Sequence, residues 1–278
     1  MGIVRIEIDE KFLPGLDVFG AKYRPFSDNV PALSTSDLNP ADFLFLEGRD
    51  GKEGHPDLWY SKHRLQTSPS VKQIGKNLGL DLADTAQEKN GRGYIGNINH
   101  GQALRLNLLL GGRTTNAKIE TDVFRMLLSG KAYDGRGKIV DKGEIDGLLD
   151  EKVGVRNPGR AEWLEDSFKS AGNGIVLMKN YVLQGDVLVP SYNAPLRGCL
   201  MNNKTPGINF RNWVKNSTSQ GWPRANIKEG ETYYWSPTAG NVARLVAYSG
   251  RAYLVGNGDP HVANSWLGVR HLRVAPKK

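Results

Sequence analysis

The sequence is poor in cysteine, and this scarcity excludes two common ways of stabilising a fold. Cys199 is the only cysteine among the 278 residues. A disulfide within the chain and a metal cluster held by several cysteines are therefore both excluded. We expect the fold to depend on packing and hydrogen bonds.

Long apolar segments and export signals are also missing from the sequence. No apolar run approaches the ~18 residues of a membrane-spanning helix, so we expect no membrane span. The chain begins MGIVRIEIDEKFLPG, in which apolar residues alternate with charged ones. This pattern predicts a strand over residues 4–8, and it lacks the basic and then apolar layout of a signal peptide.

The composition is otherwise that of a loop-rich globular protein. Glycine occurs 33 times, and 6 tryptophans and 10 tyrosines supply bulky anchors for cores and interfaces. The net charge of +8 leaves two interpretations open. One is an ordinary basic surface, and the other is attraction to polyanions such as nucleic acid or acidic glycans.

The sequence divides into two regions near the glycine-rich stretch that follows residue 90. Residues 1–95 are polar and punctuated by proline, with one short helix predicted over residues 70–80. We expect them to form an accessory region and residues 96–278 to form the main domain. Helices precede strands in the main domain, which predicts an α+β fold.

The clearest helix covers residues 117–129. Asn116 can cap its N-terminus, apolar residues recur along one face, and Gly130 can end it. The remaining predicted elements are short helices over residues 144–151 and 159–168 and strands over residues 175–178, 181–183 and 187–189.

A glycine motif and the histidines of the sequence lack the context that a dinucleotide site or a metal site needs. Residues 91–96 match the spacing GxGxxG, but the polar residues before them are no strand, so we interpret them as a glycine-rich turn. The histidines at positions 55, 63, 100, 261 and 271 show no metal-binding spacing. The sequence therefore predicts neither a dinucleotide site nor a metal site.

The closing segment, residues 233–273, carries the strongest functional signal. Small residues recur at Ala243, Ala247 and Ala252, and the side chains between them share no consistent chemistry. A strand that packs on one side alternates apolar and polar residues, but here neither face is plainly polar. This mixture indicates a surface whose exposed residues serve binding, supported by a frame of buried residues.

Two parts of the sequence resemble C-type-lectin-like domains. The closing segment opens with YYWSPT at residues 233–238 and ends with GVRHLR at residues 268–273, similar to the YWSS and VRxVR of bacterial members. Upstream, GRTT at residues 112–115, followed by Glu120, is similar to the RLPT-x-x-E of the formylglycine-generating-enzyme branch, without its proline. The scattered chemistry resembles the variable proteins of diversity-generating retroelements, known from phages, bacteria and archaeal viruses. The resemblance covers about residues 96–278.

The resemblance implies a binding protein with a diversified surface on a C-type lectin scaffold, without cofactor or metal. The target would be an unknown protein or cell-surface ligand rather than nucleic acid, and the protein would act on a virion or cell surface after cytoplasmic synthesis. Tyr253, Trp266 and His271 would act as anchors. The implied contact residues are Asn241, Leu245, Val246, Tyr253, Val255, Asn257, Gly258, His261, Val262, Trp266 and His271.

A property of the genetic code supports this surface. Changes at the adenines of an AAC or AAT codon reach a broad set of amino acids and no stop codon, and every implied contact residue except Trp266 belongs to that set. We expect these residues to be exposed on one side. We expect the frame to be buried, namely Ala243, Ala247, Ala252, Leu254, Leu267 and Val269.

Two further expectations follow for the scaffold. Residues 234–238 and 267–273 should lie in one antiparallel sheet, with the strand at residues 4–8 nearby. Leu254→Ala should cost ~2–5 kcal/mol, as for a packed leucine, whereas replacing Val255 or Asn257 should cost only ~0.5 kcal/mol.

Two other function classes remain open as alternatives. An enzyme of the formylglycine-generating type needs a pair of active-site cysteines, and its sulfoxide-synthase relatives need HxxxH; the sequence has neither. The triplets of calcium-dependent lectins are missing too.

A nucleic-acid-binding module could use the basic and aromatic residues between positions 204 and 228. The other interpretation of that stretch is a long loop anchored by its tryptophans, with its charges in solvent. Its relevant residues are Lys204, Phe210, Arg211, Trp213, Lys215, Trp222, Arg224 and Lys228.

Overall fold

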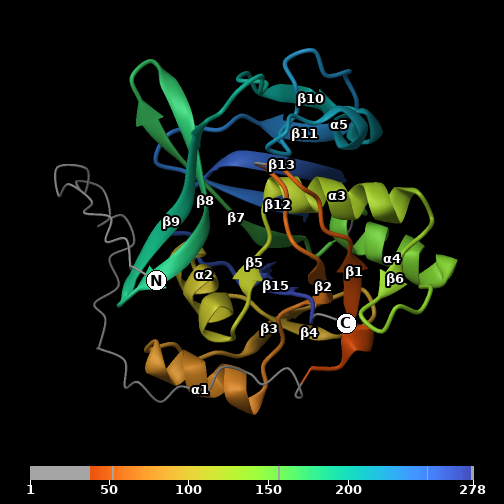
Figure 1. Ribbon diagram of the computed structural model, residues 1–278, viewed down its shortest axis with the longest axis vertical. Helices are drawn as coiled ribbons and strands as arrows, with labels where there is room; N and C mark the ends of the chain where they lie inside the picture. The colour runs from red at the N-terminus through yellow and green to blue at the C-terminus, as the bar shows by residue number, and fades with distance from the viewer. Residues whose placement is uncertain (1–37, 52, 156, 249, 277–278) are drawn as a thin grey trace.

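The computed structural model describes residues 38–51, 53–155, 157–248 and 250–276 (Figure 1). Over these residues the chain is an α+β protein, as the sequence predicted, with a large mixed sheet and a smaller antiparallel sheet. The strand expected at residues 4–8 lies outside the described residues.

The large sheet has eight strands and contains most of the closing segment. Two of its pairings are parallel, β11 with β13 and β14 with β7, and the others are antiparallel. Its strands in spatial order are β10 (Lys204–Ile208), β11 (Thr232–Trp235), β13 (Arg251–Gly258), β12 (Val242–Tyr248), β7 (Arg160–Ala171), β8 (Gly174–Gln184) and β9 (Val187–Pro195), with β14 (Leu267–Gly268) beside β7.

Strand β7 replaces the helix predicted over residues 159–168, and that prediction is wrong. The strand lies between β12 and β8, and residues 160–168 are all buried. Its charged residues, among them Arg160 and Glu162, are paired inside the protein. A strand covered on both faces shows no simple alternation of apolar and polar residues.

The smaller sheet joins both ends of the described chain. It has the strand order β5 (Arg113–Thr114), β15 (Arg270–Val274), β2 (Leu58–Arg64), β1 (Phe43–Leu46) and β6 (Tyr133–Asp134). Strand β15 pairs antiparallel with β2 and with β5. This sheet therefore contains strands from both expected regions. Strands β1 and β2 come from residues 1–95, and they are hydrogen-bonded to strands from residues 96–278.

Residues 267–268 lie in the large sheet with β11, but residues 270–273 lie in the smaller sheet, so the expectation of one antiparallel sheet is wrong. Strand β11 is in the large sheet, beside β10 and β13. Strand β15 is in the smaller sheet, where its long partner β2 comes from the region expected to be accessory. The sequence offered no local signal for this pairing, because the partners are about 200 positions apart.

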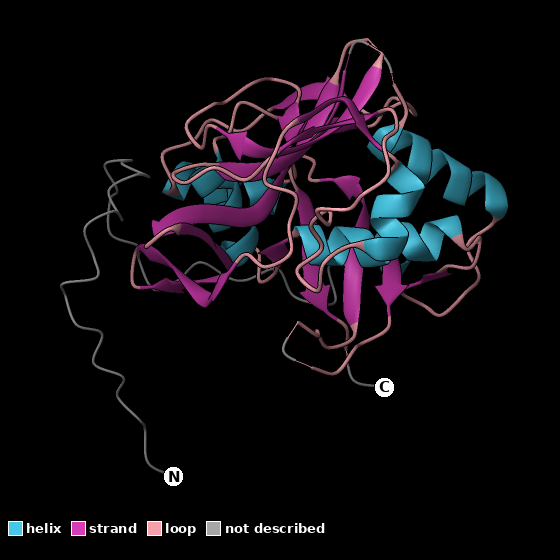
Figure 2. Cartoon of the chain, turned by 90° about the horizontal axis from the view of Figure 1, so that it is seen from above, coloured by secondary structure: helices cyan, strands magenta, loops and turns pink. Residues whose placement is uncertain are grey.

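The helices lie in two groups beside the strands (Figure 2). Helix α1 packs on α2, and α3 packs on both α4 and α5. The helices are α1 (Pro69–Asn77), α2 (His100–Leu109), α3 (Ala117–Leu128), α4 (Lys142–Val153) and α5 (Phe210–Asn216), with a 3-10 helix at Pro40–Asp42.

Local signals in the sequence explain the clearest of these elements. The Asn116 side chain accepts a hydrogen bond from the Ile119 amide, and Gly130 follows α3 with a φ of 70°, so both predicted ends are confirmed. The glycine-rich turn is confirmed in part. It joins β3 (Asp84–Gln87) to β4 (Gly93–Ile95), with Gly91 at a φ of 85°. The interpretation that the polar residues before it form no strand is wrong, because β3 is a mostly exposed strand that can be polar.

Candidate functional site

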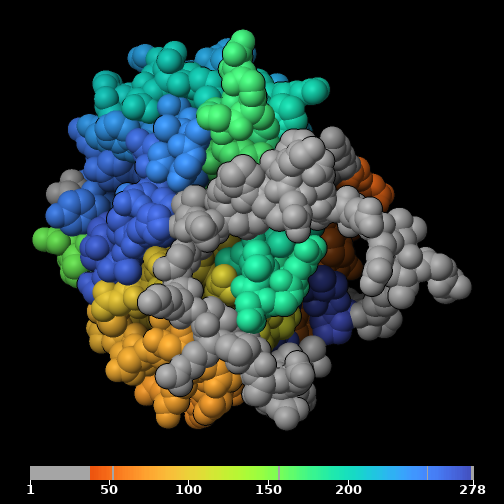
Figure 3. All heavy atoms as spheres, turned by 90° about the vertical axis from the view of Figure 1, so that its left-hand side faces the viewer, coloured from red at the N-terminus to blue at the C-terminus, as the bar shows by residue number. Residues whose placement is uncertain are grey.

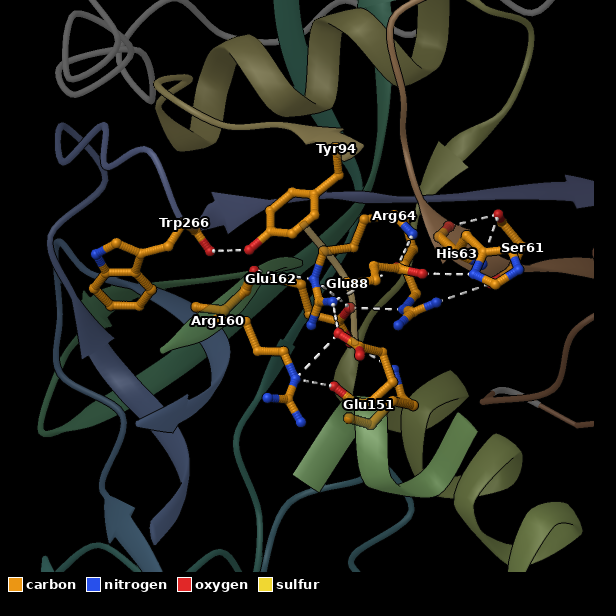
Figure 4. A network of polar contacts seen from close by, with 12 residues as sticks. Ser61, His63, Arg64, Glu88, Tyr94, Glu151, Arg160, Glu162 and Trp266 are labelled. Atoms are coloured by element: carbon orange, nitrogen blue, oxygen red, sulfur yellow. Dashed lines mark hydrogen bonds and ion pairs between the residues drawn. The ribbon is translucent and has the colours of Figure 1, made fainter. Parts of the chain in front are cut away.

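A buried network of charged groups holds the two sheets and α4 together (Figure 4). Arg270 Nε lies 2.7 Å from a Glu162 carboxylate oxygen, and Arg64 contacts Glu151 at the same distance. Lys152 Nζ lies 2.5 Å from Glu162 and 2.8 Å from Glu120. The first arginine of the GVRHLR motif therefore crosslinks β15 to β7.

The charges of this network stabilise one another. Burial favours a raised pKa for Glu162, but Arg270, Lys152 and Arg64 together hold its pKa well below the usual range. Burial likewise opposes the charge of Arg270, but Glu162, Tyr60, Glu88 and Glu120 together outweigh burial and raise the Arg270 pKa. Each charge depends on its partners, so the network acts as one unit of the fold.

The network also positions Trp266 (Figure 4). The Tyr94 hydroxyl donates to the Trp266 carbonyl at 2.9 Å, and the Ala161 amide donates to it at 3.0 Å. The Arg64 guanidinium in turn lies over the Tyr94 ring, 5.1 Å from its centroid. Two hydrogen bonds to its carbonyl therefore hold the backbone of Trp266 in place, while its side chain is only partly buried.

A serine and a histidine beside this network do not form a nucleophile and base. The Ser61 hydroxyl donates to the backbone carbonyl of His63 at 2.6 Å, while His63 Nδ1 lies 2.6 Å from Glu88. A nucleophilic arrangement would need the serine hydroxyl against the imidazole. The group fits a structural contact better than a catalytic one.

The central strands of the large sheet present two different faces. Tyr234, Leu245 and Leu254 point into one core cluster, together with Ala243. The register sets Trp235 beside Val255 and Arg244 beside Val255, so these alternate residues share the opposite face. The alternation seen in the sequence therefore separates two faces. The inner face packs in one core cluster, and on the opposite, outer face Val246 and Val255 belong to a second core cluster.

The outer face carries a shallow depression of about 400 Å³. Its floor is formed by Val246 and Val255, which are almost entirely buried. Around them stand aromatic side chains, one arginine and one amide. The lining residues are Trp235, Arg244, Val246, Tyr248, Tyr253, Val255, Asn257 and Trp266.

Aromatic contacts hold the walls of this aromatic depression in place. Tyr248 stacks on Trp266 with ring centroids 6.2 Å apart and planes at 13°. Tyr253 meets Tyr233 edge to face at 5.3 Å. Tyr248 is nevertheless 48% exposed, so the rings are fixed and still offer open surface. Rigid aromatic groups of this kind provide large contact area at low entropic cost.

Five of the eleven implied contact residues line the aromatic depression, and four lie elsewhere in the segment. The lining five are Val246, Tyr253, Val255, Asn257 and Trp266. Of the other four, His261 is exposed, Asn241 and Val262 are half-buried, and Gly258 is buried against β12. In the space-filling view, blue residues of the closing segment reach the surface beside the yellow and orange residues around α1 and α2 (Figure 3).

Leu245 and His271 are buried, so the expectation that they are exposed contacts is wrong. Leu245 packs in the core below the inner face. His271 lies on β15, where Arg273 Nε donates to its Nε2 at 2.7 Å and its Nδ1 lies 3.0 Å from the Asn107 side-chain oxygen. Burial and the charge of Arg273 lower the His271 pKa to about 3. This histidine is a neutral structural group.

The predicted frame is largely confirmed. Ala243, Ala247, Leu254, Leu267 and Val269 are at most 1% exposed. Ala252 is only half-buried, because it lies near the turn of the β12–β13 hairpin. Val246 and Val255 also belong with the frame more than with the exposed contacts, since they are 9% and 6% exposed.

Three lining residues were missed in the sequence: Trp235, Arg244 and Tyr248. Trp235 belongs to the YYWSPT opening, which suggested a rigid frame, and its outward direction depends on the parallel pairing of β11 with β13. Arg244 and Tyr248 share the alternating face of Val246 in β12. That alternation was the available signal, and it would have found both.

The residues of the two alternative functions lie in packed environments. Cys199 is buried, its thiol lies 3.4 Å from the Tyr234 hydroxyl, and burial raises its pKa to about 12. A reactive thiol needs the opposite environment. In the basic stretch, Trp213 and Trp222 are 1% and 0% exposed, so neither ring can stack on a base.

Metal and membrane features give no second site. Among the described residues, no three His, Cys, Asp or Glu side chains come together as a metal-binding group. No helix in the described part of the chain is long and apolar enough to cross a membrane. Comparisons with protein-family models, curated proteins and solved structures find no match to this chain.

Proposed function

We propose that the protein is a target-binding protein whose contact surface is the outer face of strands β11, β13 and β12. The main support for this proposal is that the two faces of the β12–β13 hairpin have different environments. Leu254 and Ala243 face the core, while Arg244 and Tyr253 on the same strands face the aromatic depression. The exposed residues of the outer face, such as Tyr248 and Asn257, can therefore vary without removing a buried core residue.

The proposed scaffold is a C-type-lectin-like domain, and the two motifs of the resemblance meet in space. Arg113 and Thr114 of GRTT form β5, which pairs with Leu272 and His271 of GVRHLR. The same motif leads directly into α3. Two segments that lie more than 150 positions apart thus form one joint, which supports their role as the fixed frame.

The composition of the aromatic depression fits recognition of a target. Tyrosine, tryptophan and arginine dominate the residues that contribute most to protein interfaces, and all three types line the depression. Arg244 and Tyr248 also belong to the amino acids reachable from AAC or AAT codons. Diversification by a retroelement would therefore reach most of the surface while leaving Trp235 and Trp266 unchanged.

The DNA sequence near the gene can be examined to test whether the segment is diversified by a retroelement. A nearby reverse transcriptase and a near-repeat of the segment encoding residues 233–273 are expected. The mismatches should fall on adenines in codons of the outer face, such as those of Arg244 and Asn257. A repeat that differs in the codons of Leu254 and Ala243 instead would contradict the proposal.

Binding itself is tested with labelled protein on a panel of cell surfaces. The double variant Tyr253→Ala/Trp266→Ala should lose binding by at least ~10-fold, as for two aromatic anchors. The matched control is Val182→Ala/Val187→Ala, which alters two exposed residues on β8 and β9. Equal binding by wild type and the aromatic double variant would refute the assigned surface.

A further inference from the structure

Arg244 lies within the aromatic depression with one of its donors unused. Its guanidinium lies over the buried Trp163 ring, 6.0 Å from the centroid. Its Nε is buried and has no hydrogen-bond partner among the described residues. This nitrogen is closed off by the surrounding protein, so a ligand in the aromatic depression would contact the rest of the Arg244 guanidinium group.

The surroundings of Arg244 leave its positive charge largely uncompensated. No carboxylate lines the aromatic depression, and within the described chain Arg244 makes no ion pair within 4.0 Å. Burial lowers the Arg244 pKa, and only the charge of Asp259 acts to raise it. The depression thus combines one partly buried cation with apolar and aromatic walls.

Resting on the proposed function, we infer that the aromatic depression receives a side-chain carboxylate of a protein partner, paired with Arg244 and flanked by apolar groups. Guanidinium and carboxylate form a charge-assisted, often bidentate pair. Such a pair is strengthened where apolar groups reduce the access of water, and the rings of Tyr248, Trp266 and Tyr253 border Arg244.

A protein partner fits these walls better than an acidic sugar. A saccharide needs many hydrogen-bonding groups for its hydroxyls, but Asn257 is the single amide in the lining, beside two tyrosines. An aspartate or glutamate with apolar neighbours would match both the cation and the rings. The basic net charge of the chain, +8, also favours encounter with an acidic partner.

The test uses small probes on the full chain, with the Arg244 Nε–H and tryptophan indole signals followed by NMR. The probe is 3-phenylpropanoate, which carries a carboxylate beside an apolar group, and its neutral counterpart is 3-phenylpropanamide. The carboxylate should bind at least ~10-fold more tightly than the amide. In R244Q this preference should disappear, while D259N should strengthen carboxylate binding by removing the nearby negative charge.

The matched control is R251Q. Arg251 lies on the same hairpin, exposed, with its guanidinium 4.3 Å from the Tyr233 ring centroid, but it does not line the depression. R251Q should keep the full preference for the carboxylate. Unchanged dispersion of the amide signals in each variant shows that the fold is intact.

Equal binding of the acid and the amide to the wild type, or loss of the preference in R251Q as in R244Q, would overturn the inference. Tighter binding of glucuronate than of 3-phenylpropanoate would overturn the assignment to a protein partner and indicate an acidic sugar. The coding-region comparison does not involve these probes. A failed titration therefore leaves the proposed function standing, and a missing repeat leaves the carboxylate site standing.

Discussion

Arg270 and Arg244 lie in two regions that use the same side chain in opposite ways. Both guanidinium groups lie about 6 Å from an aromatic ring, Tyr60 for Arg270 and Trp163 for Arg244. Arg270 is buried and paired with Glu162, whereas Arg244 is half-buried without an ion pair among the described residues. The difference separates a charge that completes the fold from a charge available to a ligand.

The largest expected effect comes from Arg270→Met, which removes the partner of Glu162. Breaking a buried ion pair leaves an uncompensated charge, so the free energy of unfolding should fall by ~3–5 kcal/mol. The matched change Arg244→Met leaves no carboxylate unpaired and should cost about 1 kcal/mol or less. Urea denaturation of both variants measures the difference. Similar losses for the two arginines would break the comparison.

Leu254→Ala is the next largest change and tests the inner face. Leu254 is 0% exposed, and removing a packed leucine side chain should lower the free energy of unfolding by ~2–5 kcal/mol. The expected small cost at Val255 is revised because this residue is 6% exposed. Its loss of methyl groups should cost about 1–2 kcal/mol. A smaller loss for Leu254→Ala than for Val255→Ala in denaturation curves would contradict this assignment of the faces.

The pH dependence of stability should report His271. Its folded pKa of about 3 lies below the ordinary value of 6.5, so the unfolded chain takes up a proton that the folded chain excludes. The stability contributed by the neutral form is therefore complete above pH 6.5 and is lost as the pH falls toward 3.

Thermal melts between pH 7 and pH 5 measure this loss, with His271→Gln as the comparison. The slope should be shallower in the variant. Asp166 acts in the opposite direction, since burial raises its pKa to about 6, but it is present in both proteins and cancels in their difference. Identical slopes would show that His271 does not hold its neutral form in the folded chain.

Local patterns in the sequence predicted what depends on neighbouring residues. The cap at Asn116 and the stop at Gly130 require only the turns of α3. The buried frame, such as Ala243 and Leu254, follows from the two-residue repeat of a strand. These predictions were confirmed because the same short segment contains both the signal and its consequence.

Two of the errors share a different cause, which is distance along the chain. The segment 159–168 was predicted as a helix, whereas it is a buried strand in which Glu162 is paired with Arg270, 108 residues away. His271 suggested a ligand contact, although Asn107 and the chain around it bury the ring. Neither pairing leaves a trace in the local sequence, so hydrophobic periodicity alone could not have found them.

The smallest expected effect on stability is at Asn257, in the rim of the aromatic depression. Asn257 is exposed, and exposed substitutions away from special features usually change stability by no more than ~0.5 kcal/mol. Asn257→Ala should therefore melt like the wild type. Asn257→Ala should still weaken the binding of 3-phenylpropanoate, since the Asn257 amide lines the aromatic depression together with Arg244. The control is Asn202→Ala, an exposed asparagine outside the lining, which should alter neither property. A marked loss of stability in Asn257→Ala would mean that the rim supports the fold, and the separation of frame from contact surface would then fail at its most exposed point.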